Sequence, residues 1–298
     1  MRLRVPATSA NLGPGFDVLG LALPLENRVT LVPAERTSFF HSGPFGAGLP
    51  DDASHLSGVA ARRLAAEVGR ELPTWRWEIA VAIPPARGLG SSSAAIVAGL
   101  VAANEAFCRP LDGLGLLRLA TELEGHPDNA APAIFGGVTA AFADGATVWC
   151  LPLADRVPAT LVAAVPDFRL STAEARAVLP PTVSRADAIA NVAAVTALTT
   201  VMLRQDVSWW AAGLGDRLHQ PWRLPLVRGA EDVLAEARAA GAWGGVLSGA
   251  GPTLMAFAPP AQAAAVAAAM DQAWRRHGVS PIVKQFTHLA AGAGPLPT

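Results

Sequence analysis

A glycine- and serine-rich loop between a strand pattern and a helix pattern constrains this chain most. The loop reads Pro84-Pro85-Ala86-Arg87-Gly88-Leu89-Gly90-Ser91-Ser92-Ser93-Ala94-Ala95. Before it, residues 75–83 alternate between apolar and other side chains with the period of two expected of a strand. After it, residues 92–107 are rich in alanine and contain no proline, as expected of a helix. The sequence therefore predicts a strand, a tight turn and a helix in succession.

A helix that begins directly after such a loop presents free backbone N–H groups and the positive end of its dipole, and these groups bind phosphate. Three successive serines favour this interpretation, because hydroxyls cap helices, contact phosphate oxygens and ligate hard cations such as Mg²⁺. Glycine-rich turns also occur without a ligand, because glycine permits a tight turn at no steric cost. The loop alone indicates a nucleotide or phosphate site and leaves a purely structural turn open.

Composition limits the classes of protein to which the chain can belong. Its 298 residues suffice for one large domain or two ordinary ones. Its net charge of −1 argues against a nucleic-acid-binding protein, which usually carries a basic patch. No apolar stretch of signal-peptide length follows the N-terminal residues, and the longest uninterrupted apolar run, residues 94–103, is shorter than the ~20 residues of a membrane-spanning helix. We therefore expect a cytoplasmic protein that binds neither nucleic acid nor a membrane.

The basic residues exclude two nucleotide-binding motifs. Lys284 is the only lysine, and the other 22 basic residues are arginine. A Walker A loop needs Gly-Lys followed by Ser or Thr, and this combination does not occur. The strand lysine of protein kinases is missing as well, since Lys284 lies near the C-terminus. If the chain transfers phosphate, it belongs to another family.

The pattern along the chain predicts two parts, residues 1–155 and 156–298, that pack around one cleft. In the first part we expect short strands on either side of a loop over residues 7–23, and a helix over residues 51–68. Asp144-Gly145 predicts the turn of a hairpin.

Four segments together carry a resemblance to a known family. They are residues 6–17, the loop at 84–95, residues 124–132 followed by Gly136-Gly137, and residues 247–253. In order and spacing they resemble the GHMP kinase superfamily, named for galactokinase, homoserine kinase, mevalonate kinase and phosphomevalonate kinase. The first and third segments are similar in particular to the branch that phosphorylates homoserine. One departure is Ser93, which stands where the common family loop has alanine.

The resemblance implies a two-part α+β fold. The N-terminal half would be similar to the second domain of ribosomal protein S5 and would bind ATP, and the C-terminal half would be ferredoxin-like. The implied reaction is ATP-dependent phosphorylation of the side-chain hydroxyl of L-homoserine, a step of threonine biosynthesis, and a homodimer is left open. The residues assigned to ATP by this resemblance are Pro84, Pro85, Ala86, Arg87, Gly88, Leu89, Gly90, Ser91, Ser92, Ser93 and Ala94.

The resemblance also implies a magnesium ion, held by Ser92 and Glu124. Both side chains offer the oxygen ligands that Mg²⁺ requires. Glu122 remains an alternative to Glu124, because family members differ in length just before His126. A carboxylate near the C-terminal end of a helix is disfavoured by the helix dipole, which gives weak support for a functional role of Glu124.

An amino-acid substrate presents a carboxylate, an ammonium and a hydroxyl group. The planar fork of arginine suits a carboxylate, and Arg176 and Arg223 match the family pattern. Asp17 is the expected partner of the ammonium group. The resemblance implies further substrate contacts from Asn11, His126, Asn129 and Gly249. Around the reacting groups it places Asn129, Asp128, Arg176 and Thr172, with Asn129 orienting the hydroxyl and Asp128 organising the pocket in a mechanism without a dedicated base.

Three alternatives stay open at this point. Another GHMP kinase could act on a different small alcohol such as mevalonate, which also carries a carboxylate. A serine hydrolase is suggested by residues 90–94, which are similar to a degenerate nucleophile elbow, although no oxyanion motif or acid-then-histidine order follows. A catalytically inactive family member is the third alternative, and the intact Ser92, Glu124 and Asp128 argue against it.

Overall fold

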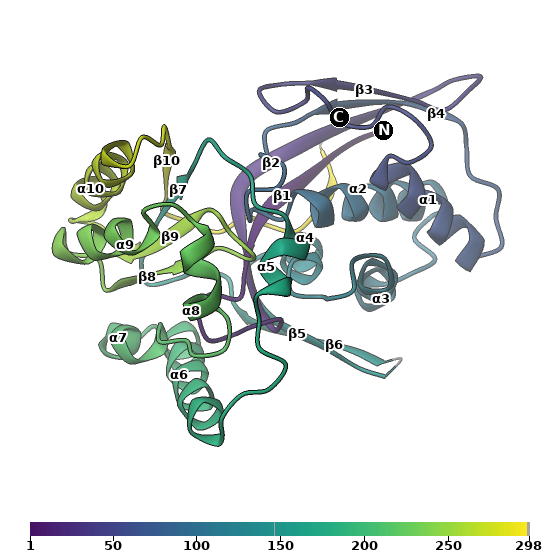
Figure 1. The fold of residues 1–298 in the computed structure, drawn as a ribbon. Helices are drawn as coiled ribbons and strands as arrows, with labels where there is room; N and C mark the ends of the chain where they lie inside the picture. The colour runs from purple at the N-terminus through teal and green to yellow at the C-terminus, as the bar shows by residue number, and fades with distance from the viewer. Residues whose placement is uncertain (146, 297–298) are drawn as a thin grey trace.

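The computed structural model describes residues 1–145 and 147–296, and it contains two sheets, each covered by helices (Figure 1). The first sheet consists of β1 (Arg2–Ala10), β2 (Leu19–Pro33), β3 (Ser38–Ser42), β4 (Trp75–Ala80), β5 (Val138–Asp144), β6 (Thr147–Ala154) and β11 (Gly294–Pro295). The second consists of β7 (Thr160–Val165), β8 (Gly244–Leu247), β9 (Leu254–Ala258) and β10 (Ile282–Phe286). The expected two-part α+β architecture is confirmed.

The long strand β2 organises the first sheet, whose main path runs β11-β1-β2-β4-β3. Its first residues pair with β5 and its last with β4, so the sheet branches along its length. One face packs against helices, as the buried Trp75, Trp77 and Ile79 of β4 alternate with the more exposed side chains between them. The helices of this half are α1 (Leu56–Glu67), α2 (Ser91–Ala106), α3 (Gly113–Glu124) and α4 (Ala130–Phe135).

Helix α2 lies at the centre of this half, between α1 and α3 (Figure 1). Nearly all of its residues from Ser93 to Asn104 are buried. A Cβ atom on Gly99 would lie 2.1 Å from the backbone carbonyl oxygen of Ser57 in α1, so the two helices approach at a distance that only glycine allows. The alanine-rich composition of α2 thus serves close packing on all sides.

The second sheet has the strand order β10-β7-β9-β8, with all neighbours antiparallel, which is the order of a ferredoxin-like fold. Alternate residues of β7 face two different cores: Val162 and Ala164 pack with α9 and α10, whereas Leu161 packs with Trp210 in the core on the other side. The helices and short 3₁₀ turns of this half are α5 (Thr172–Ala177), α6 (Arg185–Arg204), η1 (Val207–Trp209), α7 (Trp210–Gly213), α8 (Gln220–Arg223), η2 (Leu224–Leu226), α9 (Ala230–Ala239) and α10 (Ala263–Arg276).

The division expected after residue 155 falls in the connection between β6 and β7, where the chain leaves the first sheet. We propose this connection as the boundary between the two halves. The C-terminal residues then return to the first half, because β11 pairs with β1 and Ala291 forms a bridge with Gly136.

Two expected elements are wrong in their bounds. The loop expected over residues 7–23 is largely strand, because β1 continues to Ala10 and β2 begins at Leu19, with these ends paired to each other. The helix expected from residue 51 begins only at Leu56, where His55 caps it. The hairpin at Asp144-Gly145 is confirmed by the pairing of β5 with β6, and Ala146 of its turn lies outside the described residues.

The sequence analysis looked for a membrane-spanning helix among uninterrupted apolar runs, and this search missed helix α6. It is 20 residues long, its most apolar 18-residue window has a mean hydropathy of 1.6, and 28% of that window is buried. By length and composition it is the one helix of residues 1–145 and 147–296 that could cross a membrane. An asparagine and several threonines interrupt its apolar residues, and a search for unbroken runs therefore missed it.

Candidate active site

The glycine loop ends at Gly90, which precedes α2 in the left-handed conformation (φ 67°). The first backbone hydrogen bond of the helix runs from the N–H of Ala94 to the carbonyl of Gly90, at 2.8 Å. The N–H groups of the three serines before Ala94 thus have no acceptor in the helix and are free for a ligand. A Cβ atom on Gly90 would lie 1.9 Å from Oγ1 of Thr8, so both the backbone angle and the space require glycine.

A polar cleft opens at this helix end and is lined by both halves of the chain. The four sequence segments that carry the family resemblance meet in it. Every residue that we assigned to catalysis, substrate or metal lines the cleft, namely Asn11, Asp17, Ser92, Glu124, His126, Asp128, Asn129, Thr172, Arg176, Arg223 and Gly249. Of the residues assigned to ATP, the cleft contains Ala86, Arg87, Gly88, Gly90, Ser91, Ser92 and Ser93.

The other assigned loop residues lie elsewhere. Pro85 and Ala94 line a second pocket, described below, whereas Pro84 and Leu89 are buried and line neither cavity. The side chain of Arg87 donates hydrogen bonds to the backbone carbonyls of residues 166 and 167, both at 2.8 Å. Arg87 therefore fastens the glycine loop to the second half of the molecule.

Hydrogen bonds across the cleft join the two halves. Asn11 Nδ2 donates to the carbonyl oxygen of Gly249 at 2.8 Å, and Asn11 Oδ1 accepts from the N–H of Asp17 at 2.9 Å. On the other side, Ser248 Oγ donates to the carbonyl oxygen of Gly88 at 2.6 Å. The loop between β8 and β9 is thus fixed to the glycine loop and to the end of β1. Ser248 was not assigned a role from the sequence, although it lies inside the fourth segment.

Arg223 is almost completely buried, with 1% of its surface exposed. Its Nε donates to the carbonyl of Ala175 at 2.9 Å, Nη1 lies 3.2 Å from Nδ1 of His219, and the guanidinium lies 5.0 Å from the centre of the Phe16 ring. Burial, followed by the charge of Arg176, lowers its pKa. Among the described residues no carboxylate forms a salt bridge with Arg223. A buried cation without a counter-ion is costly, so this position is suited to an anionic ligand.

Arg176 of α5 pairs with Asp17 in a bidentate salt bridge. Nη1 lies 2.9 Å from Oδ2 and Nη2 lies 2.8 Å from Oδ1. Both side chains remain about one third exposed, at 37% and 33%. The bridge places one positive and one negative group side by side at the cleft, next to the unpaired charge of Arg223.

Ser92 and Glu124 lie together at the start of α2, where Ser92 Oγ donates to Glu124 Oε2 at 3.1 Å. Burial raises the pKa of Glu124, which is held at the last residue of α3. The described residues contain no group of three or more His, Cys, Asp or Glu side chains that could hold a metal ion. A hydroxyl and one carboxylate fit Mg²⁺, which binds few protein oxygens and completes its shell with phosphate and water.

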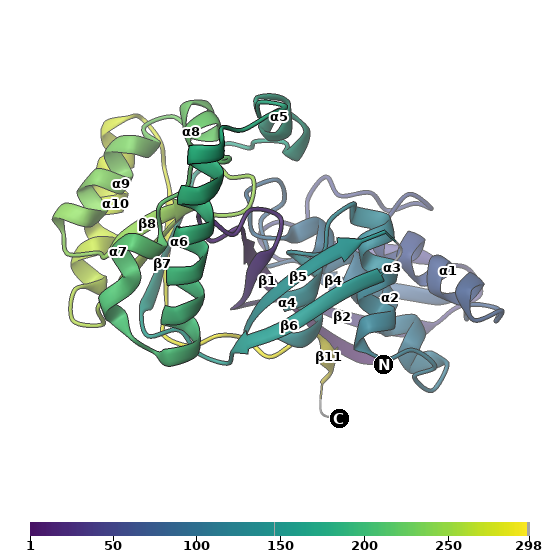
Figure 2. The same ribbon diagram turned by 90° about the horizontal axis from the view of Figure 1, so that it is seen from below.

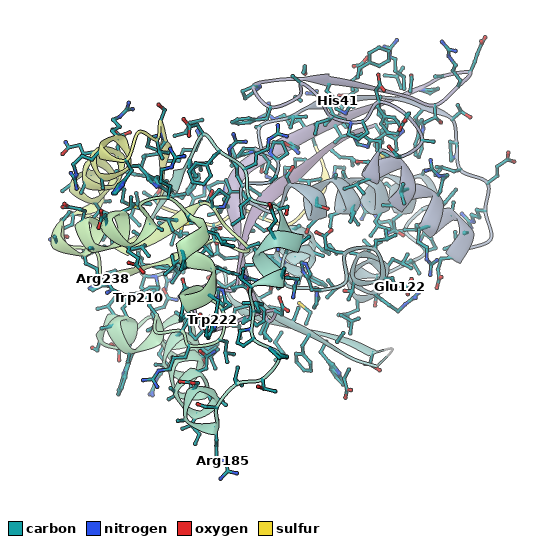
Figure 3. All side chains as sticks on the ribbon, in the orientation of Figure 1. His41, Glu122, Arg185, Trp210, Trp222 and Arg238 are labelled. Carbon is teal, nitrogen blue, oxygen red and sulfur yellow. The ribbon has the colours of Figure 1, made fainter. Side chains whose placement is uncertain are left out.

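Glu122 occupies a different environment. Its Oε2 lies 2.7 Å from Nη2 of Arg63, and its Oε1 lies 2.5 Å from Nη1 of Arg118. It projects from the outer side of α3 (Figure 3) and does not line the polar cleft. The geometry therefore favours Glu124 over Glu122 as the metal ligand.

A hydrogen-bonded group of side chains lies beside the N-terminal end of α2. His126 Nδ1 lies 2.6 Å from Asp128 Oδ1, and Thr8 Oγ1 donates to Asn129 Oδ1 at 2.8 Å. Burial lowers the pKa of His126, but the hydrogen bond with Asp128 and the charges of Asp128 and Glu124 outweigh it, so the pKa is raised. Thr8 fixes the orientation of the Asn129 amide, a role that sequence reasoning missed.

A mainly apolar pocket lies on the other side of the start of α2 and shares Ala86, Ser91 and Ser92 with the polar cleft. Its remaining lining residues come from β2, β3, β4, α1, α2 and the segments before α1 and α2. They are Asn27, Val29, His41, Leu49, Pro50, His55, Leu56, Ser57, Ile79, Val81, Pro85, Ala94, Ala95 and Ala98. Because the two cavities meet at the free N–H groups, a nucleotide bound there can place its base in the apolar pocket and its phosphates at the cleft.

The two histidines of the apolar pocket are uncharged at neutral pH. Burial, followed by the charge of His41, lowers the pKa of His55 to about 4. Burial also lowers the pKa of His41. His41 belongs to β3 and is labelled in Figure 3. The ring of His55 stacks between those of Phe39 and His41, with centroids 4.3 and 5.1 Å away. These neutral rings suit an uncharged aromatic base.

Comparison with known proteins identifies the family. Residues 55–137 match the N-terminal domain of the GHMP kinases, and residues 195–276 match their C-terminal domain. A curated homoserine kinase of Trichormus variabilis is 45% identical over 297 residues, covering 98% of this chain and 97% of the relative. Another, of Desulfitobacterium hafniense, is 43% identical over 280 residues and covers 94% of each chain. The chain belongs to the homoserine kinase family of GHMP kinases.

The solved structure of homoserine kinase from Cytophaga hutchinsonii superimposes on this GHMP kinase with a TM-score of 0.89 at 27% identity, covering 99% of this chain and 97% of that one. Family membership removes the serine hydrolase alternative, and the geometry agrees. Ser92 of this family member hydrogen-bonds to Glu124, and no histidine in the described part of the chain hydrogen-bonds to any of its loop serines.

Proposed function

We propose that this protein transfers the γ-phosphoryl group of ATP to the side-chain hydroxyl of L-homoserine, giving O-phospho-L-homoserine and ADP. The observation that carries the proposal is Arg223, a buried guanidinium without a carboxylate partner in the same cleft as a phosphate-binding helix end. The curated homoserine kinases at 43–45% identity support the choice of amino acid.

The nucleotide would span both cavities. Its base would occupy the apolar pocket beside the neutral His41 and His55, and its phosphates would accept hydrogen bonds from the N–H groups at the start of α2. The helix dipole adds a favourable field for the phosphate charge. This arrangement performs the task of a Walker A loop without a lysine.

Homoserine would lie at the opposite end of the polar cleft. Its carboxylate would bind Arg223 and Arg176, and its ammonium group would bind Asp17. A zwitterion can therefore replace the internal Arg176–Asp17 bridge with two bridges to itself, while it also neutralises Arg223. The walls beside it would come from Asn11, Thr172 and Gly249.

The hydroxyl oxygen would attack the γ-phosphorus as the bond from that phosphorus to the bridging oxygen of ADP breaks. Asn129, oriented by Thr8, would direct the hydroxyl, with His126 beside it. Asp128 is engaged with His126 and so organises the site; a loose transition state requires little early removal of the proton, which passes late to a phosphoryl oxygen. Positioning and charge stabilisation then account for most of the rate.

Ser92 and Glu124 would hold a Mg²⁺ ion together with phosphate oxygens. When bound, such an ion supplies neutralisation of the charge that develops on the phosphoryl oxygens. We further propose a cytoplasmic enzyme of threonine biosynthesis that acts as a homodimer.

Product identification tests the proposal. Purified protein is incubated with ATP, Mg²⁺ and L-homoserine, and the product is analysed by ³¹P NMR and mass spectrometry, with a reaction lacking homoserine as the control. We expect a phosphomonoester on the side-chain oxygen of homoserine. Absence of that product, together with ATP-dependent phosphorylation of mevalonate or galactose in a parallel reaction, would overturn it.

A further inference from the structure

A fully buried histidine, His219, lies directly before α8, and the proposed reaction gives it no role. Its Nε2 lies 2.9 Å from the carbonyl oxygen of Gly13 and 3.6 Å from Oδ2 of Asp216, whereas its Nδ1 lies 3.2 Å from Nη1 of Arg223. A carbonyl only accepts and a guanidinium only donates, so Nε2 carries the proton and Nδ1 is the acceptor. Burial lowers the pKa of His219 and outweighs the charge of Asp216, so the ring is neutral at pH 7.

Several independent contacts hold His219 in place. The carboxylate of Asp216 accepts hydrogen bonds from three successive backbone N–H groups around it, at 2.7–3.1 Å. Oε1 of the next residue, Gln220, accepts from the N–H of Leu247 in β8 at 2.7 Å. The imidazole stacks on the ring of Phe16, with the centroids 5.0 Å apart. His219 is therefore a fixed point between the second half, to which it belongs, and the segment between β1 and β2.

Two hydrogen bonds fix the guanidinium plane of Arg223. Nε donates to the carbonyl of Ala175 in α5, which lies beside α8 in Figure 1 and in Figure 2, and Nη1 donates to Nδ1 of His219. A planar group that is bonded at two of its nitrogens cannot turn about the bonds that join it to the chain. The other three N–H groups, one on Nη1 and two on Nη2, have no hydrogen-bond partner within residues 1–145 and 147–296. Since Arg223 lines the cleft, these groups are available to a ligand in one fixed orientation.

We propose that His219 is a positioning residue for Arg223, and that through it the cleft selects hydroxy amino acids by the length of their side chain. The inference rests on the proposed function, in which Arg223 binds the substrate carboxylate and the start of α2 binds the phosphates of ATP. His219 holds both ends of the cleft in one frame, because it bonds to Gly13 in the first half, which contains α2, and to Arg223 in the second. With the carboxylate anchored, the number of carbons before the hydroxyl determines whether that oxygen reaches the γ-phosphorus.

The size of the expected selection follows from geometry. One methylene group more or less moves the hydroxyl by at most about 1.5 Å, the length of a carbon–carbon bond, and a misplacement of about 1 Å costs on the order of 10²-fold in rate. L-Serine is one carbon shorter than L-homoserine, and L-5-hydroxynorvaline is one carbon longer. We expect the wild type to discriminate against both. A guanidinium that is free to turn would accommodate the longer substrate better and the correct one less well.

Three substitutions separate the two contacts of the imidazole. His219→Leu removes both. His219→Asn places its amide oxygen near the position of Nδ1 and keeps an acceptor for Arg223, whereas His219→Gln places its amide nitrogen near the position of Nε2 and keeps a donor for Gly13. Trp222→Leu is the matched control, since Trp222 is 47% exposed on the same helix, is labelled in Figure 3 and lies outside the cleft.

The test measures kcat/KM for the three hydroxy amino acids by ADP release. His219→Leu should lower the value for homoserine roughly ten-fold or more and should lower the preference for homoserine over 5-hydroxynorvaline at least about five-fold, with KM for ATP unchanged. His219→Asn should keep this preference better than His219→Gln, and Trp222→Leu should keep it fully. A wild type without the preference, an equal loss for all three substrates in His219→Leu, or a stronger preference in His219→Gln than in His219→Asn would overturn the proposal.

Nuclear magnetic resonance of the full-length protein tests the positioning without any substrate. In ¹⁵N-arginine-labelled protein, the two Nη atoms of a fixed guanidinium exchange slowly by rotation about the Nε–Cζ bond, and the signal of Arg223 is assigned by its loss in Arg223→Lys. We expect slow exchange in the wild type and in His219→Asn, and faster exchange in His219→Leu. Equal rates in the wild type and His219→Leu would show that His219 does not position Arg223.

The two measurements separate the possible failures. If the wild type releases no ADP with homoserine, the proposed function is wrong and the selection by length falls with it, whereas the exchange rates still report whether His219 holds Arg223. If His219→Leu does not fold, His219→Asn and His219→Gln decide both measurements, because each keeps one polar contact of the buried ring. Exchange in His219→Gln as slow as in His219→Asn would then overturn the proposal.

Discussion

At the scale of single residues, the cleft contains a buried positive charge without a salt-bridge partner among the described residues. Arg223 is buried beside an aromatic ring and a neutral backbone carbonyl, while Asp17 of the same cleft is bound to Arg176. Such an arrangement lowers the stability of the empty protein and is compensated when an anion enters. On the proposed function, the substrate would supply the anion that Arg223 lacks.

The arginine fork itself can be tested. Arg223→Lys keeps the charge but loses bidentate geometry, and it should raise KM for homoserine roughly ten-fold or more, from the loss of about 1.5–3 kcal/mol for a charged hydrogen bond. KM for ATP should change little, because we propose that the nucleotide binds at the other end of the cleft. Steady-state kinetics of this variant and of Arg217→Lys, an exposed arginine outside the cleft, provide the comparison. An equal rise in both KM values would indicate a structural role for Arg223.

The assignment of the metal ligand makes a second residue-scale prediction. Glu124→Gln should reduce kcat by orders of magnitude at saturating ATP and Mg²⁺, because the amide is a poorer ligand and the developing phosphoryl charge loses its neutralisation. Glu122→Gln should reduce kcat far less, since Glu122 serves a surface network with Arg63 and Arg118. The reverse order, measured by ADP release, would show that the wrong glutamate has been assigned.

At the scale of elements, the sequence predicted the bounds of α2 more accurately than the bounds of the strands β1 and β2. Glycine and serine at the start and alanine throughout define this helix without help from distant residues, so its expected bounds agree with the structure to within one residue at each end. The ends of β1 and β2 were missed because Thr8 and Ser9 look like loop residues, and only pairing with β2 shows that they are strand. The apolar pocket could not be predicted, since its walls come from strands, helices and connecting segments that are far apart in the sequence and share no motif.

The turn before α2 has a testable requirement. Gly90→Ala should destabilise the protein by at least about 1–2 kcal/mol, because alanine is strained in the left-handed conformation and its Cβ would clash with Thr8. It should also weaken ATP binding by displacing the helix end. Thermal unfolding and nucleotide titration measure both effects. Gly215→Ala, where a Cβ meets open space, is the control. Equal behaviour of the two variants would contradict the geometry of the loop.

The cap of α1 predicts a dependence of stability on pH. Burial lowers the pKa of His55 in the folded chain to about 4, below the ordinary histidine pKa of about 6.5, so between these pH values the unfolded chain binds a proton that the folded chain does not. Stability should therefore fall as the pH is lowered from about 6.5 towards 4, by on the order of 3 kcal/mol from this group. His55→Asn retains a cap and does not titrate, and its stability should fall less over this range in denaturant titrations.

The control for this prediction is His288→Asn, at an exposed position. It should keep the acid sensitivity of the wild type, because the substitution leaves His55 and its surroundings unchanged. If His55→Asn and the wild type lose stability in parallel between these pH values, another group is responsible for the acid sensitivity.

At the scale of the whole molecule, the two halves form one site. The first half supplies the N-terminal end of α2, the apolar pocket and the acidic residues, and the second supplies Arg176, Arg223 and the loop that contains Gly249. From four short segments, the family resemblance predicted that these residues line one cleft, and the structure shows that they do. Thr8 and Ser248 lie in those segments, yet their contacts depend on tertiary structure and had to be seen.

The most direct test of the central claim compares kcat/KM for three alcohols by ADP release: L-homoserine, 3-aminopropan-1-ol and mevalonate. The second lacks the carboxylate of homoserine, and the third lacks its ammonium group. If Arg176, Arg223 and Asp17 bind the two charges of the substrate, homoserine should exceed each of the others by roughly two orders of magnitude or more, from about 1.5–3 kcal/mol for each charged hydrogen bond lost. Comparable values for 3-aminopropan-1-ol or mevalonate, or no turnover of homoserine, would contradict the account.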